Sequence, residues 1–138
     1  MADPTAQAKH ILELFNKADW DAMSDALPSD TTYKEHGTQR SIEGAGDIVE
    51  AMRGWKTAMP DVAGTVQSTI ATGNQVALEV VWEGNHTGPL VTADGEIPAS
   101  GKHQKTPGVW VFDFDGDTLT ESRNYFDMLT FLQQIGAA

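Results

Sequence analysis

An α+β fold is predicted by three features of the sequence. Apolar residues recur at helical spacing over much of the first 59 residues, whereas four runs after residue 61 alternate apolar and polar residues as strands do. Turn sequences at Gly73-Asn74 and Asp115-Gly116 would join neighbouring runs as antiparallel hairpins. We therefore expect N-terminal helices followed by a strongly curved antiparallel sheet, in a single domain that covers residues 1–138.

Three helices are expected before the sheet. The first covers about residues 4–18 and begins after a cap at Asp3. The second is short and ends before Pro28. The third runs from a cap at Asp47 to Pro60, and its apolar stripe is expected to pack in the concave face of the sheet. That stripe consists of Ile48, Met52, Trp55 and Met59.

The strands follow from alternation. A short strand is expected at residues 31–36, with Tyr33 and Glu35 on one face. Residues 84–105 are rich in glycine, proline and small polar residues, and we expect a functional loop or rim there. A short helix that stops at Gly136 should follow the last strand. The four long strands are expected at 62–71, 75–83, 106–114 and 118–126.

Composition excludes several classes of function. The chain has 9 basic and 20 acidic residues, a formal charge of −11 and no cysteine. This charge would repel nucleic acid, and without cysteine there is no disulfide, thiol nucleophile or thiolate metal site. Met1-Ala2-Asp3-Pro4 is not the start of a signal peptide, and no stretch reaches the ~18 apolar residues that cross a membrane. We predict a cytoplasmic protein with neither a nucleic-acid nor a membrane partner.

Metal and cofactor motifs are not evident in the sequence. His36 lies beside Glu35, and His86 lies near Glu83, but the spacing matches neither His-x-His nor His-x-x-x-His. The chain also has no glycine-rich phosphate loop, no nucleophile elbow and no Ser-His-Asp order. We therefore predict no metal and no cofactor.

Several motifs in the C-terminal half carry a resemblance to a known family. They are Trp82-Glu83-Gly84-Asn85-His86-Thr87-Gly88, Ile97-Pro98-Ala99-Ser100-Gly101-Lys102, Phe114-Asp115-Gly116, and Tyr125-Phe126-Asp127 followed by Gln134-Ile135-Gly136. With the order of the elements, they resemble the SnoaL-like polyketide cyclase family of the nuclear transport factor 2-like superfamily, over essentially the whole chain. The resemblance implies a cone-shaped α+β barrel, with a curved antiparallel sheet wrapped around an N-terminal helical layer and a short C-terminal helix.

The chain departs from the catalytic pattern of that family. The position of the family's acid/base aspartate falls on Asn124, and its accompanying histidine falls near Val109. More distantly, residues 123–127 resemble a run in limonene-epoxide hydrolases, whose catalytic carboxylate also falls on Asn124. The Arg-x-Asp pair of those hydrolases falls on Val80 and Trp82.

An aromatic pocket is expected around Asn124. Strand alternation places Phe126 on the same face as Asn124, and the resemblance adds further aromatic side chains. Such a pocket suits a flat, mostly apolar organic ligand, although the same tryptophans could equally fill the core of a small domain. The expected substrate-binding residues are Tyr33, Trp55, Trp82, Trp110 and Phe126.

Four polar residues are candidate catalytic groups. Asp127 could be a base if apolar neighbours raise its pKa, or it could cap the last helix through the Thr130 amide. His86 could shuttle protons, or it could order its own loop. Glu35 could be the base that Asn124 cannot be, or it could be solvated at a strand end.

The leading hypothesis is a cofactor-independent acid/base enzyme of cyclase, isomerase or dehydratase type. It would act on a small, largely apolar, carbonyl-bearing or polycyclic substrate, with Asp127 or Glu35 as the base. His86 and Tyr33 would donate to a developing enolate, and Asn124 would orient the substrate. The alternative is a non-catalytic binding module for small molecules, and epoxide hydrolysis ranks lowest. The resemblance also implies a homodimer formed through the sheet face away from the cavity.

Overall fold

A computed structural model describes residues 3–138, so Met1 and Ala2, on which the signal-peptide prediction partly depends, lie outside the described residues. Within this range the chain forms four helices, a six-stranded sheet and a two-stranded sheet. The elements are α1 (Pro4–Lys17), α2 (Trp20–Ala26), β1 (Thr32–Glu35), β2 (Arg40–Glu43), α3 (Ala45–Ala58), β3 (Ala63–Thr72), β4 (Gln75–Asn85), β5 (Leu90–Thr92), β6 (Gly95–Ile97), β7 (His103–Asp115), β8 (Thr118–Phe126) and α4 (Met128–Gln134). The predicted α+β fold is confirmed.

The helix ends follow local capping chemistry. The Asp3 carboxylate accepts a hydrogen bond from the Thr5 amide at 3.1 Å, and Ala18, the residue that caps the C-terminal end of α1, adopts a left-handed conformation. The expected cap of α3 was wrong: the helix begins two residues before Asp47, after Gly44, whose φ of 92° favours glycine. Asp47 lies in the first turn instead, where an acidic side chain interacts favourably with the helix dipole.

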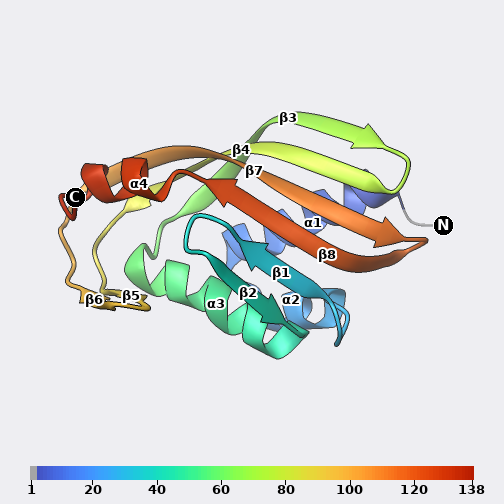
Figure 1. Cartoon of the computed structure of the whole chain (residues 1–138), viewed down its shortest axis with the longest axis horizontal. Helices are drawn as coiled ribbons and strands as arrows, with labels where there is room; N and C mark the ends of the chain where they lie inside the picture. Colours follow the sequence, from blue (N-terminus) through green and yellow to red (C-terminus); the bar gives the residue numbers. More distant parts are fainter. Residues whose placement is uncertain (1–2) are drawn as a thin grey trace.

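The large sheet has the strand order β2-β1-β8-β7-β4-β3 and remains open within the described chain (Figure 1). Neighbouring strands are antiparallel, as expected, except β1 and β8, which pair in parallel. Strand β2 was not predicted, because Ile42 is its only large apolar residue. The parallel pairing joins the first strand of the chain to the last and positions the site described below.

The segment predicted as a loop at residues 84–105 is partly regular. It contains the end of β4, the β5–β6 hairpin and the first residues of β7. At Gly88 the backbone passes so close to α3 that a Cβ atom would lie 2.0 Å from the Thr57 carbonyl oxygen. The Gly88 amide donates to the Ala58 carbonyl oxygen at 3.0 Å, which ties this segment to the end of α3.

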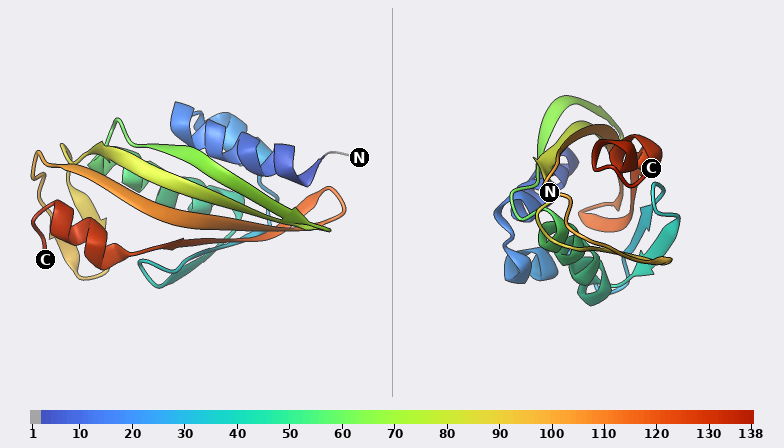
Figure 2. Two further views of the ribbon diagram at one scale, coloured as in Figure 1. Left: turned by 90° about the horizontal axis from the view of Figure 1, so that it is seen from above. Right: turned by 90° about the vertical axis from the view of Figure 1, so that its left-hand side faces the viewer.

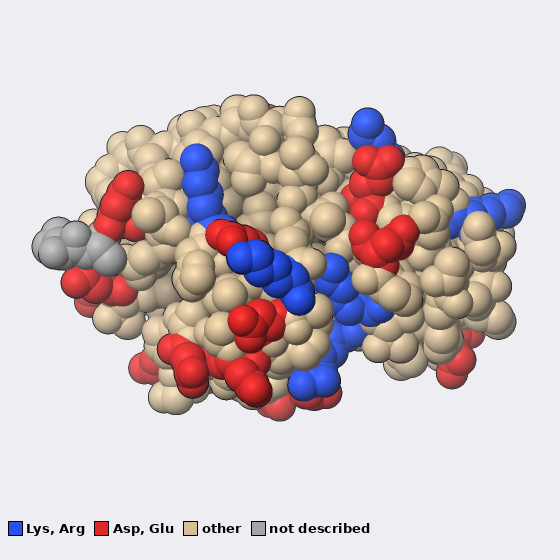
Figure 3. All heavy atoms as spheres, turned by 180° about the vertical axis from the view of Figure 1, so that it is seen from behind, with Lys and Arg blue, Asp and Glu red and all other residues tan. Residues whose placement is uncertain are grey.

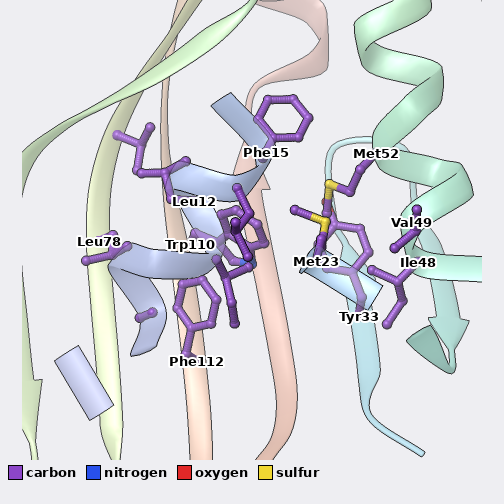
Figure 4. Close-up of a cluster of buried hydrophobic side chains, with 14 of the residues drawn as sticks. Leu12, Phe15, Met23, Tyr33, Ile48, Val49, Met52, Leu78, Trp110 and Phe112 are labelled. Atoms are coloured by element: carbon purple, nitrogen blue, oxygen red, sulfur yellow. The ribbon is translucent and has the colours of Figure 1, made fainter. Parts of the chain in front are cut away.

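The core lies between the concave side of the sheet and the helices. Figure 2 shows the sheet curving around the interior, with α4 at the same end of the long axis as the C-terminus. In Figure 4, the apolar side chains of α1 and α3 meet those of the sheet, with Trp110 and Phe112 on β7 and Tyr33 on β1. The expectation that α3 packs against the concave face agrees with this arrangement.

Apart from Glu35, which is buried, the charged side chains of the described residues lie outside this core. On the face shown in Figure 3, acidic and basic side chains are interspersed. Over the whole sequence, acidic residues outnumber basic ones by 20 to 9. In the described part of the chain, no helix is long and apolar enough to cross a membrane. No group of three or more metal-ligating side chains is found among residues 3–138.

Candidate functional site

A small cavity of about 50 Å³ lies between the sheet and the helices. Its floor comes from β1, β4, β7 and β8, and the rest of its wall comes from α1, α3, the segment after α3, and α4. The side chains that line it are aromatic, aliphatic, thioether, amide or hydroxyl groups. They are Phe15, Tyr33, Met52, Trp55, Met59, Val62, Trp82, Gln104, Thr106, Asn124, Phe126 and Phe131.

The register of three strands brings the polar residues of the floor together. In the parallel pair, Glu35 of β1 is opposite Asn124 of β8, and Tyr33 is opposite Ser122. On the other side of β8, Asn124 is opposite Trp110 of β7. Residues separated by two positions share a face of a strand, so Tyr33, Glu35 and Asn124 all point inward.

Glu35 is a buried carboxylate surrounded by donors, with 1% of the residue exposed. Oε2 accepts from the Tyr33 hydroxyl at 2.6 Å and from the Trp55 indole N–H at 3.0 Å. Oε1 accepts from the Thr38 hydroxyl at 2.6 Å and from Arg40 Nε at 2.8 Å. The alternative of a solvated strand end does not describe Glu35, because four donors hold its carboxylate inside the protein.

Tyr33 links this carboxylate to the cavity. Its hydroxyl donates to Glu35 and accepts from Asn124 Nδ2 at 3.4 Å. Burial, and then the nearby negative charge of Glu35, raise the pKa of the Tyr33 phenol well above its ordinary value. Tyr33 therefore remains a neutral phenol, and its O–H is directed at Glu35 rather than at a ligand in the cavity.

Asp127 lies at the surface and caps α4. Its Oδ1 accepts from the Leu129 amide at 3.0 Å and from the Thr130 amide at 3.3 Å, while Oδ2 accepts from the Thr130 hydroxyl at 2.7 Å. The hydrogen bonds from Thr130 are the main reason why the pKa of Asp127 is lowered. Of the two roles predicted for Asp127, the geometry matches the helix cap.

His86 is fully buried and organises the segment that follows β4. Its Nδ1 accepts from the Ser100 amide at 3.2 Å and lies 2.9 Å from the Ser100 hydroxyl. The His86 backbone also bonds to Lys102 and Gly101. Burial lowers the pKa of His86. Because Nδ1 accepts the Ser100 amide proton, the neutral form of the ring carries its proton on Nε2. The geometry matches the alternative in which His86 orders its own loop.

Four of the five predicted aromatic residues line the cavity: Tyr33, Trp55, Trp82 and Phe126. Trp110 is packed beneath them, with its ring centre 6.1 Å from that of Tyr33. The Trp82 indole lies over Gly108, where an added Cβ atom would be 2.6 Å from the Tyr125 carbonyl oxygen and 3.4 Å from Trp82 Nε1. Glycine at this position therefore lets the indole lie close to the sheet.

Gln104 and Thr106 also line the cavity but were not predicted as site residues. The Thr106 hydroxyl donates to Gln104 Oε1 at 2.7 Å and accepts from Gln134 Nε2 at 3.1 Å. Gln104 Nε2 donates to the sulfur of Met59 at 3.4 Å. Gln104 lay in the segment predicted as a loop, although its alternation with Thr106 continues the pattern of β7 and could have indicated an inward position.

Chemically, the site combines an apolar, aromatic cavity with a short polar chain at one end. That chain runs from Asn124 through Tyr33 to Glu35. It can accept and pass a proton, because a phenol can take a proton on its oxygen while giving its own to a neighbouring carboxylate. With metal-ligating clusters absent from residues 3–138, the side chains present offer acid/base and hydrogen-bonding chemistry.

Comparison with known proteins gives a family and a fold. The family model described as SnoaL-like polyketide cyclase matches residues 6–135. A hypothetical protein from Catenulispora acidiphila, solved in complex with trimethylamine and described as having a ketosteroid isomerase-like fold, has a TM-score of 0.80 and 17% identity, covering 96% of this chain and 93% of that one. TsrD from Streptomyces laurentii has a TM-score of 0.80 and 19% identity, with all of both chains covered.

A third similar structure is an LEH-like epoxide hydrolase from M. tuberculosis, with a TM-score of 0.71 and 18% identity, covering 96% of this chain and 88% of that one. Comparison with curated proteins gave no match. At these identities the structural similarities establish the fold alone, and the family model gives the family.

Proposed function

The chain belongs to the SnoaL-like polyketide cyclase family, and we propose that it is a cofactor-independent acid/base enzyme of cyclase or isomerase type. Its substrate is a small, largely apolar compound that carries a carbonyl group. The observation that carries this proposal is the 2.6 Å hydrogen bond between the Tyr33 hydroxyl, in the cavity wall, and the buried Glu35 carboxylate behind it.

In the proposed reaction, the Tyr33 oxygen removes a proton from the carbon next to the substrate carbonyl. The phenol proton moves to Glu35 at the same time, so Tyr33 stays neutral and Glu35 becomes the protonated acid, while the electron pair of the broken C–H bond passes to the carbonyl oxygen and leaves the substrate as an enolate. The reverse transfer returns a proton to a different atom of the substrate, which completes an isomerisation or ring closure. Asn124 orients the substrate, and the aromatic walls exclude water.

The proposal gives no proton transfer to Asp127 or His86. The oxygens of Asp127 are bonded to the first turn of α4, and His86 Nδ1 is bonded to Ser100. The cavity volume of about 50 Å³ favours a small substrate.

The test is deuterium incorporation into small cyclic ketones in D₂O, followed by NMR, over a size series from cyclopentanone to 2-tetralone. We expect exchange above the buffer rate for the wild-type protein, and losses of about a hundredfold in Tyr33→Phe and Glu35→Gln. Asp127→Asn should exchange at the wild-type rate and serves as the matched carboxylate control. Exchange that survives in both Tyr33→Phe and Glu35→Gln would disprove the role of this pair.

A second candidate function is a binding module that holds a small molecule without changing it. It is favoured by the amide of Asn124 at the position that the family resemblance matches to an acid/base aspartate, and by the trimethylamine complex of the Catenulispora protein. In that case ligands would bind without any exchange of deuterium. Epoxide hydrolysis is the least supported reaction, because no carboxylate is among the residues that line the cavity in the described chain.

For the assembly, we infer a homodimer formed through the outer face of the sheet. A shallow groove of about 340 Å³ crosses β3, β4, β7 and β8 there, and Val81, Pro107, Val109 and Tyr125 supply apolar side chains to it. Light scattering should give the mass of a dimer, and Val109→Lys should give that of a monomer. The cytoplasmic location stays a prediction.

A further inference from the structure

Two polar atoms of the side chains that line the cavity lack a partner within residues 3–138, Trp82 Nε1 and Asn124 Oδ1. Trp82 Nε1 lies against the sheet, 3.4 Å from where a Cβ atom would stand at Gly108, which leaves Asn124 Oδ1 as the unpaired acceptor. Asn124 Oδ1 has no hydrogen bond within residues 3–138, although the residue is only 6% exposed and its side chain lines the cavity. A buried acceptor without a donor costs free energy, so native proteins rarely keep one without a reason. In the wall of a cavity, such an atom is a contact point for a bound molecule.

The orientation of the Asn124 amide follows from its neighbours. The Tyr33 hydroxyl gives its only proton to Glu35, so its oxygen can only accept from Asn124. The atom of Asn124 that faces Tyr33 must therefore be the donor Nδ2. Turning the amide over would bring two acceptors face to face, so Oδ1 is left for the cavity.

Glu35 fixes the direction in which these hydrogen bonds are donated. Its carboxylate is held by Trp55, Thr38 and Arg40, all of which donate to it, and an ionised carboxylate only accepts hydrogen bonds. The direction of donation is thus fixed along the chain from Asn124 through Tyr33 to Glu35. At its cavity end, the chain presents an acceptor.

The rest of the wall adds a second requirement. The side chains that line the cavity carry no formal charge, so a charged ligand would lose its hydration without meeting an opposite charge there. An uncharged ligand has a much smaller desolvation cost.

We propose that this cavity recognises an uncharged ligand through a hydroxyl group that donates to Asn124 Oδ1, which makes Asn124 the specificity-determining residue. The inference rests on the proposed function, because it places the ligand in the same cavity. Enols and phenols carry such a hydroxyl. Ketone, ether and phenolate oxygens offer only lone pairs, which would face the lone pairs of Oδ1. The site therefore favours the enol over the keto form of a carbonyl compound.

Phenol and anisole are the matched probes, since anisole keeps the aromatic ring and the oxygen but lacks the hydroxyl proton. Calorimetry near neutral pH, where phenol is uncharged, should give a Kd for phenol about tenfold lower than that for anisole. Cyclohexanone should also bind more weakly than phenol. In Asn124→Leu the ratio should fall to about one, chiefly through weaker phenol binding. Met52→Leu, an apolar change in the same wall, should keep the ratio.

Equal affinities of the wild-type protein for phenol and anisole would overturn the inference. They would mean that Oδ1 is satisfied inside the protein, as it would be if the unpaired Trp110 indole N–H reached it. Absence of binding by either probe, or a ratio that persists in Asn124→Leu, would also overturn it. The Kd values of the wild-type protein for phenol and anisole test the inference even if Asn124→Leu does not fold. If the protein binds phenol more tightly than anisole but catalyses no deuterium exchange, only the proposed enzyme activity is disproved. If it catalyses exchange but binds the two probes equally, only this inference is disproved.

Discussion

The carboxylate of Glu35 accepts hydrogen bonds from Tyr33 on the cavity side and lies 2.8 Å from Nε of Arg40 on the solvent side. The Arg40 side chain is 41% exposed, whereas that of Glu35 is fully buried. A buried carboxylate that loses its cation destabilises the folded state more than an exposed pair would.

Arg40→Ala should therefore lower the free energy of unfolding by about 2 kcal/mol, because it leaves Glu35 buried without a counter-charge. Glu35→Gln should cost less in the Arg40→Ala background than in the wild-type protein, with a coupling energy of about 1 kcal/mol or more. Urea unfolding of the four proteins in this cycle gives both values. Strictly additive costs would show that the ion pair does not contribute.

Asp127→Ala should lower the melting temperature by a few degrees, because α4 loses its N-terminal cap. The folded pKa of Asp127 is lowered, so its contribution is present above the unfolded pKa of about 4 and is lost as the pH falls through the folded value. Thermal melts at several pH values should show the difference from wild type disappearing in acid. The affinity of Asp127→Ala for phenol should equal that of the wild-type protein. A large loss of affinity would show that Asp127 contributes to ligand binding.

His86→Gln should remove a pH-dependent part of the stability. Because the folded pKa of His86 is lowered, its contribution is present above the unfolded value of about 6.5 and is lost as the pH falls. The stability difference between wild type and His86→Gln should therefore be greatest near about pH 8 and shrink towards about pH 5.

Gly108→Ala should destabilise the protein by about 1–3 kcal/mol, because the new methyl group would lie 2.6 Å from the Tyr125 carbonyl oxygen and press on the Trp82 indole. Gly54→Ala is the matched substitution in α3, where no atom lies within 4 Å of the added Cβ. It should stabilise the protein by about 0.5–1 kcal/mol through higher helix propensity. A neutral Gly108→Ala would indicate that the strands separate easily at this point.

Hydrophobic periodicity predicted the elements that bury a regular apolar face. These are α1, α2, α3 and the four long strands, each within a few residues of its observed bounds. Periodicity could not identify β2, which has one large apolar residue, or the parallel pairing of β1 with β8, because pairing between distant segments leaves no local signal.

The same limit applies to the site. Alternation placed Tyr33 and Glu35 on one face, but the donors that hold Glu35 come from Arg40 in the unpredicted strand and from Thr38 in the turn before it. Capping chemistry predicted one of the two possible roles of Asp127, the cap of α4, and the hydrogen bonds of its carboxylate match that role. Gln104 was not predicted as a site residue because its strand begins inside a segment whose composition is typical of a loop.

The parallel pairing of β1 with β8 also has a consequence for the order of folding. The hydrogen bond between Tyr33 and Asn124 joins residues that are 91 positions apart. Contacts with such long sequence separation carry a high loop-closure entropy and form late. During synthesis, the helices and β1 leave the ribosome well before β8. Because Asn124 and Phe126 of β8 belong to its wall, the cavity is complete only when the last strand has docked.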